Sequence, residues 1–181
     1  TRIIMGVGSK ELCEQNLDRL KSNWPQAPVS VMSAALGRHE LHGQVVYGTI
    51  GTLYSRAHQL GQCTLLLIDE CHMVGPGGMY RKLVDGLRKF NPSMRVIGWT
   101  GTPFRGNGLL LHLSENALFD DIAAKVTMRE LLDAGFLAPL TTAHVETQID
   151  VSSVGLSDDD YKIGELAKVS DEDPIVRKAC A

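Results

Sequence analysis

The feature that most constrains this chain is an apolar run that ends abruptly in charge. Leu65–Ile68 is apolar at every position, and Asp69, Glu70 and His72 lie directly beyond it. A short run of this kind predicts a strand that is buried on both faces, as in the middle of a parallel sheet. Because open α/β sheets bind ligands beyond the carboxyl ends of their strands, we expect these polar side chains to face a binding crevice.

The rest of the sequence alternates between apolar runs and segments with helical spacing. This alternation predicts an α/β domain that is built on a parallel β-sheet flanked by helices. We expect Leu65–Ile68 to be central, with Val96–Trp99 on one side and either Ile3–Val7 or Val45–Tyr47 on the other. Helices are expected at about 9–24, 52–61, 80–90 and 128–134.

Asp69 and Glu70 form an adjacent pair of carboxylates, which face different ways on an extended chain. One carboxylate can hold a metal ion while the other handles a water molecule, and nucleotide hydrolysis uses both roles. The residues alone leave another interpretation open, because a solvated acidic turn is also common after a strand.

A second polar strand end strengthens the functional interpretation. The expected strand at Val96–Trp99 runs directly into Thr100–Thr102, which reads Thr-Gly-Thr. That segment and Asp69–His72, which reads Asp-Glu-Cys-His, resemble motifs III and II of the DExH-box helicases of superfamily two. Gly101 stands where motif III usually has alanine, and it leaves the backbone freer. The resemblance runs from about residue 2 to about residue 139 and points to the RadD-like bacterial DNA-repair members.

This resemblance implies a RecA-like fold of the P-loop NTPase type, with ATP and Mg²⁺ as cofactors. It implies that Asp69 orients Mg²⁺ through a water molecule and that Glu70 activates the attacking water. His72, Thr100 and Thr102 are expected to couple ATP hydrolysis to nucleic-acid binding, because an imidazole can exchange hydrogen bonds with a hydroxyl. For His72 the alternative is a strand-end histidine with satisfied hydrogen bonds and no coupling role.

Four residues at strand ends or helix starts are candidate contacts to nucleic-acid phosphates. The resemblance places Ser9 and Lys10 in motif Ia, and Thr49 and Thr52 in the region of motif Ib. Backbone N–H groups at a helix start suit an anion, although a plain helix-capping role is an open alternative for these hydroxyls. Contacts to phosphates would make binding sequence-tolerant and strongly salt-dependent.

The sequence lacks the phosphate-cradling loop of an NTPase, which has the pattern G-x-x-x-x-G-K-[ST]. Gly6–Lys10 contains glycines and a lysine, but at a different spacing. We therefore expect residues 1–145 to form a first RecA-like domain that is incomplete at its N-terminus. Residues 146–181 are expected to be an acidic linker and helix that lead toward a second RecA-like domain. The isolated chain is expected neither to bind ATP tightly nor to hydrolyse it.

Charge, hydropathy and cysteine content limit how and where such a protein could act. A formal net charge of −3 gives no general basic footprint for nucleic acid, so the contacts would have to be local. The sequence has no apolar run long enough to span a membrane. Its four cysteines form no Cys-x-x-Cys pair, which favours reduced thiols in the cytoplasm.

These features favour part of the motor domain of an ATP-dependent DNA helicase or translocase, in DNA repair or recombination. DNA, single-stranded or branched, would be held through its phosphates. Three alternatives stay open: the motor subunit of a restriction enzyme, an RNA helicase, and a nucleic-acid-binding module that does not hydrolyse ATP. A nuclease or zinc domain elsewhere in the parent protein would separate the helicase classes.

Overall fold

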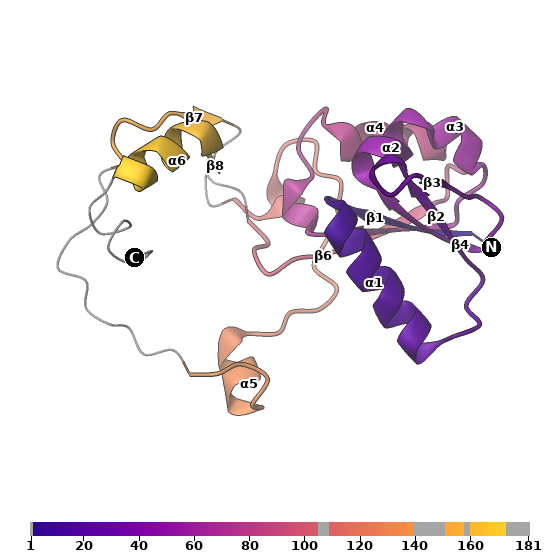
Figure 1. Ribbon diagram of the computed structural model, residues 1–181, viewed down its shortest axis with the longest axis horizontal. Helices are drawn as coiled ribbons and strands as arrows, with labels where there is room; N and C mark the ends of the chain where they lie inside the picture. The colour runs from indigo at the N-terminus through magenta and orange to yellow at the C-terminus, as the bar shows by residue number, and fades with distance from the viewer. Residues whose placement is uncertain (1, 105–108, 140–150, 158–159, 173–181) are drawn as a thin grey trace. The chain divides into compact units, whose positions relative to one another are not determined.

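The computed structural model describes residues 2–104, 109–139, 151–157 and 160–172 (Figure 1). The chain divides into two compact units, each of which is described by itself. The first holds Thr1–Arg105 and Leu109–Asp121, and the second holds Gly106–Gly108 and Ile122–Ala181. Among the described residues, no helix has the length and apolar character that crossing a membrane requires.

A six-stranded sheet forms the centre of the first unit. Its neighbouring strands are parallel, except that β3 runs antiparallel to β2. In spatial order the strands are β3 (Arg38–His39), β2 (Val29–Ser33), β4 (Val45–Thr49), β1 (Ile3–Val7), β5 (Leu65–Asp69) and β6 (Arg95–Trp99). The predicted α/β class with a parallel sheet is therefore confirmed, and β5 has β1 and β6 as its two neighbours.

Helices lie on both faces of this sheet (Figure 1). Helix α1 (Lys10–Asn23) covers one face, and α2 (Ile50–Ser55), α3 (Ala57–Leu60) and α4 (Met79–Arg88) cover the other. Short 3₁₀ turns connect the larger elements at η1 (Ala34–Leu36), η2 (Cys71–Met73) and η3 (Leu111–Leu113).

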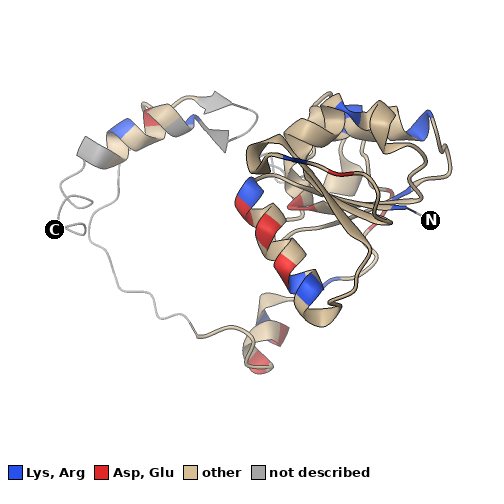
Figure 2. Ribbon diagram, turned by 45° about the vertical axis from the view of Figure 1, so that its right-hand side comes forward, with Lys and Arg blue, Asp and Glu red and all other residues tan. Residues whose placement is uncertain are grey.

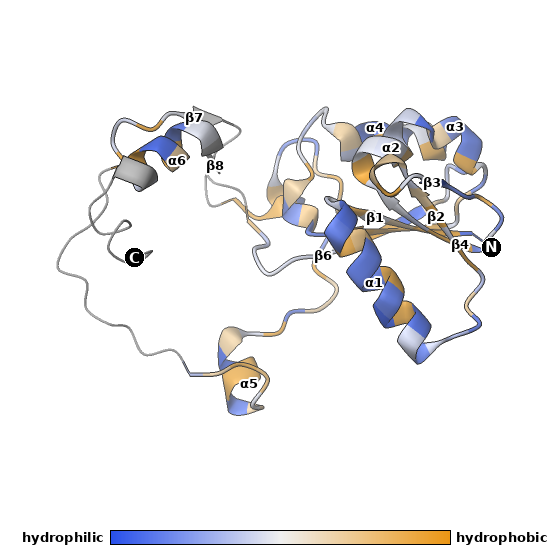
Figure 3. Cartoon of the chain, viewed as in Figure 1, coloured by the Kyte–Doolittle hydropathy of each residue, from blue (hydrophilic) through white to orange (hydrophobic). Residues whose placement is uncertain are grey.

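Alternate residues of β1, β2, β4 and β5 pack into two separate apolar clusters, as the two-residue repeat of a strand requires. Ile4, Leu66 and Ile68 join the larger cluster with α2, α3 and α4, whereas Met5 and Val7 join the smaller one beneath α1. Figure 3 shows the strands in hydrophobic colours and α1 with a hydrophilic outer side. Because the strands other than β3 run parallel, their carboxyl ends lie at one edge of the sheet.

The expectation that β5 lies at the centre and is buried on both faces is only partly right. Strand β5 has a neighbour on each side but lies next to the last strand of the sheet, and only one of its faces is fully buried. Leu66 and Ile68 are fully buried, but Leu65 and Leu67 on the opposite face are half-buried. On the neighbouring strand β6, Ile97 and Trp99 are 51% and 43% exposed. The physical reason is the position of α1, which packs against β1 and β4 and so leaves this part of the sheet less covered.

The second unit contains α5 (Met128–Asp133), β7 (Leu156–Ser157), β8 (Asp160–Tyr161) and α6 (Ile163–Glu172). Helix α5, expected from the sequence at about 128–134, begins with a capping box, in which Thr127 and Glu130 bond reciprocally at the helix start. Helix α6 lies in a stretch whose acidic composition suggested a linker. Its Glu165 accepts a hydrogen bond from the backbone N–H of Gly155 over 2.7 Å. An acidic residue of α6 therefore fixes the segment that directly precedes β7. The sequence of residues 142–149 suits an edge strand, and Pro174 suits the start of the helix expected within 146–181, but both places lie outside the described residues.

Candidate functional site

Two neighbouring strands bring the predicted motifs to one edge of the sheet. Strands β5 and β6 are parallel and in register, with Asp69 opposite Trp99. Glu70 and Thr100 therefore begin their loops side by side, although thirty positions of sequence separate them. Parallel strands make this convergence obligatory, because all their carboxyl ends lie on the same edge.

Glu70 is the residue that turns the chain away from β5. It has φ 51° and ψ 51°, a left-handed backbone conformation that residues other than glycine rarely adopt. Strain of this kind is tolerated only where the surroundings enforce it, and it is common at functional sites. The turn leads directly into η2, where His72 lies beside the Glu70 carboxylate.

His72, the last residue of the Asp-Glu-Cys-His segment, contacts the Thr-Gly-Thr segment. Its Nδ1 atom lies 2.8 Å from Oγ1 of Thr100 and 3.2 Å from a carboxylate oxygen of Glu70. Thr100 accepts a hydrogen bond from the backbone N–H of Thr102 over 3.1 Å, and the two hydroxyls are 3.4 Å apart. The structure thus brings together all three residues that the sequence suggested for coupling. A single ring nitrogen has two competing partners, and a carboxylate can only accept a hydrogen bond.

Asp69 is held at both carboxylate oxygens. Its Oδ1 accepts a hydrogen bond from the backbone N–H of Glu70, and its Oδ2 accepts one from the side-chain amide of Asn16, each over 3.0 Å. Sequence reasoning missed Asn16, which lies on α1. The signal was present in the helical pattern, since a polar residue stands in the stripe of Leu12, Cys13, Leu17 and Leu20 that faces the sheet.

Buried groups pack tightly beneath the Asp69–Glu70 turn. Burial raises the pKa of the Cys71 thiol to about 11, so the thiol stays neutral and unreactive at ordinary pH. Burial also raises the pKa of Tyr80 to about 12. Gly98 of β6 lies against this turn, and a Cβ atom there would lie 2.5 Å from the Cβ of Cys71. The close approach of β6 to the turn therefore depends on this glycine.

Ser9 and Lys10 lie at the start of α1. The Ser9 hydroxyl caps the helix by accepting a hydrogen bond from the N–H of Leu12 over 3.2 Å. Lys10 is exposed and lies 3.8 Å from Glu11, a weak surface ion pair. Figure 2 shows both basic and acidic residues along α1. The helix as a whole is therefore not a basic surface, and a contact to a phosphate would have to use a single residue such as Lys10.

Thr49 and Thr52 are buried, unlike a typical phosphate contact. They are only 8% and 6% exposed, and their hydroxyls lie 3.2 Å from each other. Thr49 also donates to Ser33 over 3.2 Å, and Thr52 accepts from the backbone N–H of Ala34 over 2.9 Å. These hydroxyls fasten the end of β4 to the end of β2, a role that the sequence pattern did not indicate.

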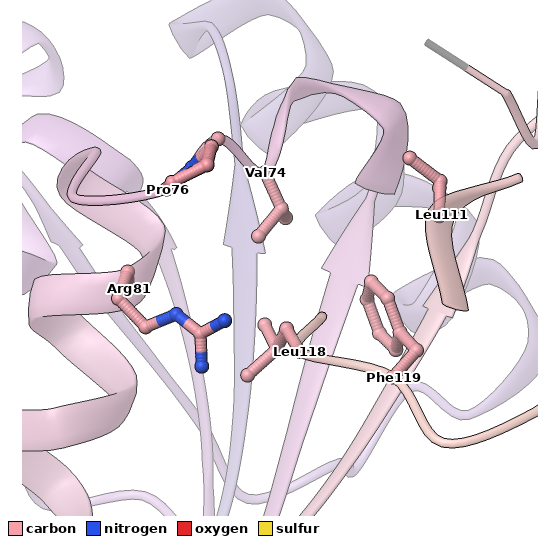
Figure 4. Close-up of a pocket in the computed structure, with 7 residues that line it drawn as sticks. Val74, Pro76, Arg81, Leu111, Leu118 and Phe119 are labelled. Atoms are coloured by element: carbon pink, nitrogen blue, oxygen red, sulfur yellow. The ribbon is translucent and has the colours of Figure 1, made fainter. Parts of the chain in front are cut away.

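A small hollow lies behind the loop that follows η2 (Figure 4). Its volume of about 10 Å³ is room for no more than about one water molecule. Arg81 reaches into this region from α4 and donates a hydrogen bond to the backbone carbonyl of Asn116. The residues around the hollow are Val74, Gly75, Pro76, Arg81, Leu111, Leu118 and Phe119. This place is part of the packing and not a nucleotide pocket.

Comparison with solved structures supports the fold assignment. The chain is similar to a nuclease-deletion mutant of the Type ISP restriction-modification enzyme LlaGI, solved in complex with a DNA substrate mimic. The TM-score is 0.51 at 10% sequence identity, over 75% of this chain and 14% of that one. Together with the sheet of mostly parallel strands between helices, this likeness shows a RecA-like α/β fold.

Comparison with other sequences gives one relative and one family. The "Putative ATP-dependent helicase IRC3" of Saccharomyces cerevisiae is 24% identical over 170 residues. The match includes 90% of this chain, which spans only 24% of the yeast protein. The family model described as "Type III restriction enzyme, res subunit" matches residues 1–105, more than half of the chain and all of the motifs above. The chain therefore belongs to the ResIII family, that of the type III restriction enzyme res subunit.

Proposed function

We propose that this chain is part of the motor domain of an ATP-dependent DNA helicase or translocase of the RadD-like, Asp-Glu-Cys-His subtype, with a role in DNA repair or recombination. The observation that carries the proposal is the 2.8 Å contact between His72 and Thr100. It joins two strand-end motifs at one sheet edge, beside the paired carboxylates Asp69 and Glu70. The fold and the family support the same class of protein.

The carboxylates fit a magnesium nucleotide. Mg²⁺ is usually bound through one or two carboxylates together with substrate phosphates and water. Asp69 and Glu70 provide such a pair, and the described residues hold no cluster of three or more metal-ligating side chains that would suggest a dedicated protein cage. Each oxygen of Asp69 accepts one protein hydrogen bond and keeps a further lone pair. When bound, Mg²⁺ would neutralise charge on the phosphates, and Asp69 would hold it through water.

Glu70 is the residue that we assign to the attacking water. The Glu70 side chain is 45% exposed at the sheet edge, so water has access to it. Glu70 accepts the water proton as the oxygen approaches the phosphorus atom. The neighbouring Nδ1 of His72 lies 3.2 Å away and can donate to the carboxylate in one of its two hydrogen-bonding arrangements. The choice between Glu70 and Thr100 is the proposed coupling event, and Thr102 extends it along the loop.

Nucleic acid would contact the start of α1 through phosphates. Lys10 supplies an exposed positive charge, and Ser9 orders the first turn of the helix beside it. The hydroxyls of Thr49 and Thr52 already have protein partners. We therefore propose that these two residues support DNA binding indirectly, by fixing the turn after β4. DNA is the proposed partner, and the DNA substrate mimic bound by the LlaGI relative is consistent with that choice. RNA is the alternative.

A restriction-enzyme motor subunit is the second candidate function. It is favoured by the family description and by the restriction enzyme among the structural relatives. A module without ATP hydrolysis is less favoured, since the carboxylates and the His72 contact are all in place. An RNA helicase would use the same residues and stays an alternative. In every motor version, residues 1–145 belong to a first RecA-like domain, and 146–181 lead toward a second one. The free, buried thiols of Cys13, Cys63 and Cys71 suit a reducing cytoplasm.

The proposal is tested by Glu70→Gln in the intact protein. The variant keeps the shape of the side chain but cannot accept a proton, so ATP binding should persist while hydrolysis falls about 10²–10⁴-fold. Nucleotide binding and steady-state hydrolysis are measured on the same preparation. Glu14→Gln is the matched control, because Glu14 is an exposed carboxylate on α1. Near-normal turnover in Glu70→Gln would remove this residue from the catalytic role.

A further inference from the structure

The Asn16 amide connects α1 to the carboxyl end of β5. Its Nδ2 atom donates to Oδ2 of Asp69 over 3.0 Å, across 53 positions of sequence. Asn16 is half-buried, and its neighbours Cys13 and Leu17 are buried in the cluster beneath α1. Apolar packing on both sides therefore fixes the place from which the amide reaches the carboxylate.

The amide completes a two-point support for Asp69. The other oxygen, Oδ1, accepts a hydrogen bond from the backbone N–H of Glu70 over 3.0 Å. The terminal torsion of an aspartate is broad, so one hydrogen bond leaves the carboxylate plane free to rock. Two donors from different elements hold the plane, and they leave one lone pair on each oxygen for another partner.

We propose that Asn16 is a positioning residue for Asp69, which sets the carboxylate for the water shell of a bound Mg²⁺. The inference rests on the proposed function of Asp69. Hydrogen bonds to a metal-binding carboxylate orient it, and removal of such an outer partner typically weakens metal affinity 10–100-fold. Neither the helix pattern nor the strand-end motif specifies this contact by itself. It arises where α1 crosses the sheet.

A purely structural role makes a different prediction. If the hydrogen bond only docks α1 on the sheet, its loss lowers the free energy of unfolding and affects nucleotide binding equally with and without metal. If Asn16 positions Asp69, its loss changes the dependence on Mg²⁺ and leaves metal-free binding unchanged. The two roles are therefore separable by a measurement that does not involve turnover.

The experiment measures binding of a fluorescent ATP analogue to the intact protein, across a Mg²⁺ titration and in EDTA. Asn16→Ala should raise the Mg²⁺ concentration for half-maximal nucleotide binding about tenfold. Binding in EDTA should stay at the wild-type level. Asn23→Ala is the matched control, because Asn23 is an exposed asparagine of the same helix whose amide donates to the Arg19 carbonyl of that helix. It should titrate like the wild type.

Measurements in the Asp69→Ala background distinguish failure of the positioning role of Asn16 from failure of the metal role of Asp69. There, Asn16→Ala should have no further effect on the Mg²⁺ midpoint, since its action passes through Asp69. If Asp69→Ala shifts the midpoint and Asn16→Ala does not, the positioning role is overturned while the function of Asp69 stands. An equal Asn16→Ala shift in both backgrounds also overturns it. If Asp69→Ala itself has no effect, the proposed metal role fails and the inference fails with it.

A second variant guards against loss of the folded state. Asn16→Ser keeps a small polar side chain in the half-buried position but is too short to reach Asp69. If Asn16→Ala unfolds, the same shift in the Mg²⁺ midpoint is expected from Asn16→Ser, with thermal unfolding recorded alongside. A folded Asn16→Ser protein with a wild-type midpoint would overturn the proposal.

Discussion

At the scale of single residues, the site depends on the left-handed conformation of Glu70. With φ 51°, this residue bends the chain so that Asp69 and His72 are presented at one edge. His72 then has two partners for one nitrogen, Thr100 at 2.8 Å and Glu70 at 3.2 Å. In the proposed coupling, bound nucleotide would change the contact between His72 and Glu70. The contact between His72 and Thr100 would then change, and with it the loop after β6.

His72→Ala in the intact protein tests this coupling. Basal ATP hydrolysis should be retained, because metal and water are assigned to Asp69 and Glu70, whereas stimulation by DNA should be lost. Hydrolysis is measured with and without DNA. His58→Ala, at an exposed position of α3, is the control and should behave like the wild type. If both activities of His72→Ala stay at the wild-type level, or fall by the same factor, His72 is not the coupling residue.

At the scale of elements, the edge is held together by close contacts between loops and strands. The turn after β5 lies against β6 at Gly98, where a side chain would have no room. The end of β4 is fastened to the end of β2 by the buried hydroxyls of Thr49, Thr52 and Ser33. Helix α1 is joined to β5 by Asn16. Each strand end is therefore positioned by a neighbour that is distant in sequence.

Gly98→Ala tests the contact between β6 and the turn. The added methyl group would lie 2.5 Å from the Cβ of Cys71 and 2.7 Å from the ring of Phe119, so the elements must shift. Overpacking of this kind typically costs about 1–3 kcal/mol. Urea unfolding should show this loss in the free energy of unfolding. Gly101→Ala is the matched control, since a Cβ atom there meets nothing within 4 Å, and an equal loss in both variants would refute the packing explanation.

At the scale of the whole molecule, the chain carries the paired carboxylates Asp69 and Glu70 without a phosphate-cradling loop in its sequence. It spans 24% of its yeast relative, and strand β6 with its exposed Ile97 and Trp99 is the last strand of the described sheet. These observations bear on the proposal that the chain is part of a motor domain, which a binding measurement tests. The carboxylates alone would hold a nucleotide weakly, because backbone N–H groups and a lysine normally bind its phosphates.

The isolated 181-residue chain should therefore show no saturable ATP binding at concentrations that saturate the intact protein. Equilibrium binding of a fluorescent ATP analogue in Mg²⁺ measures this directly, with the intact protein as the positive control. Asp69→Ala in the isolated chain shows whether any residual signal depends on the carboxylate. Tight binding that Asp69→Ala abolishes would mean that this chain holds the triphosphate by itself.

The sequence by itself determined the α/β class, the two strands that lead into the paired motifs and the meeting of those motifs at one edge. Apolar runs record burial directly, and parallel strands must share a carboxyl edge. It also indicated His72, Thr100 and Thr102 as neighbours, because both of their segments begin at that edge.

Only the tertiary structure decided the rest. The half-buried face of β5 follows from where α1 crosses the sheet, and the inward orientation of Thr49 and Thr52 follows from their hydrogen bonds to the end of β2. The contact between Asn16 and Asp69 likewise joins elements 53 positions apart. No local pattern records such pairings, since each depends on how a helix or loop packs against a strand that is remote in sequence.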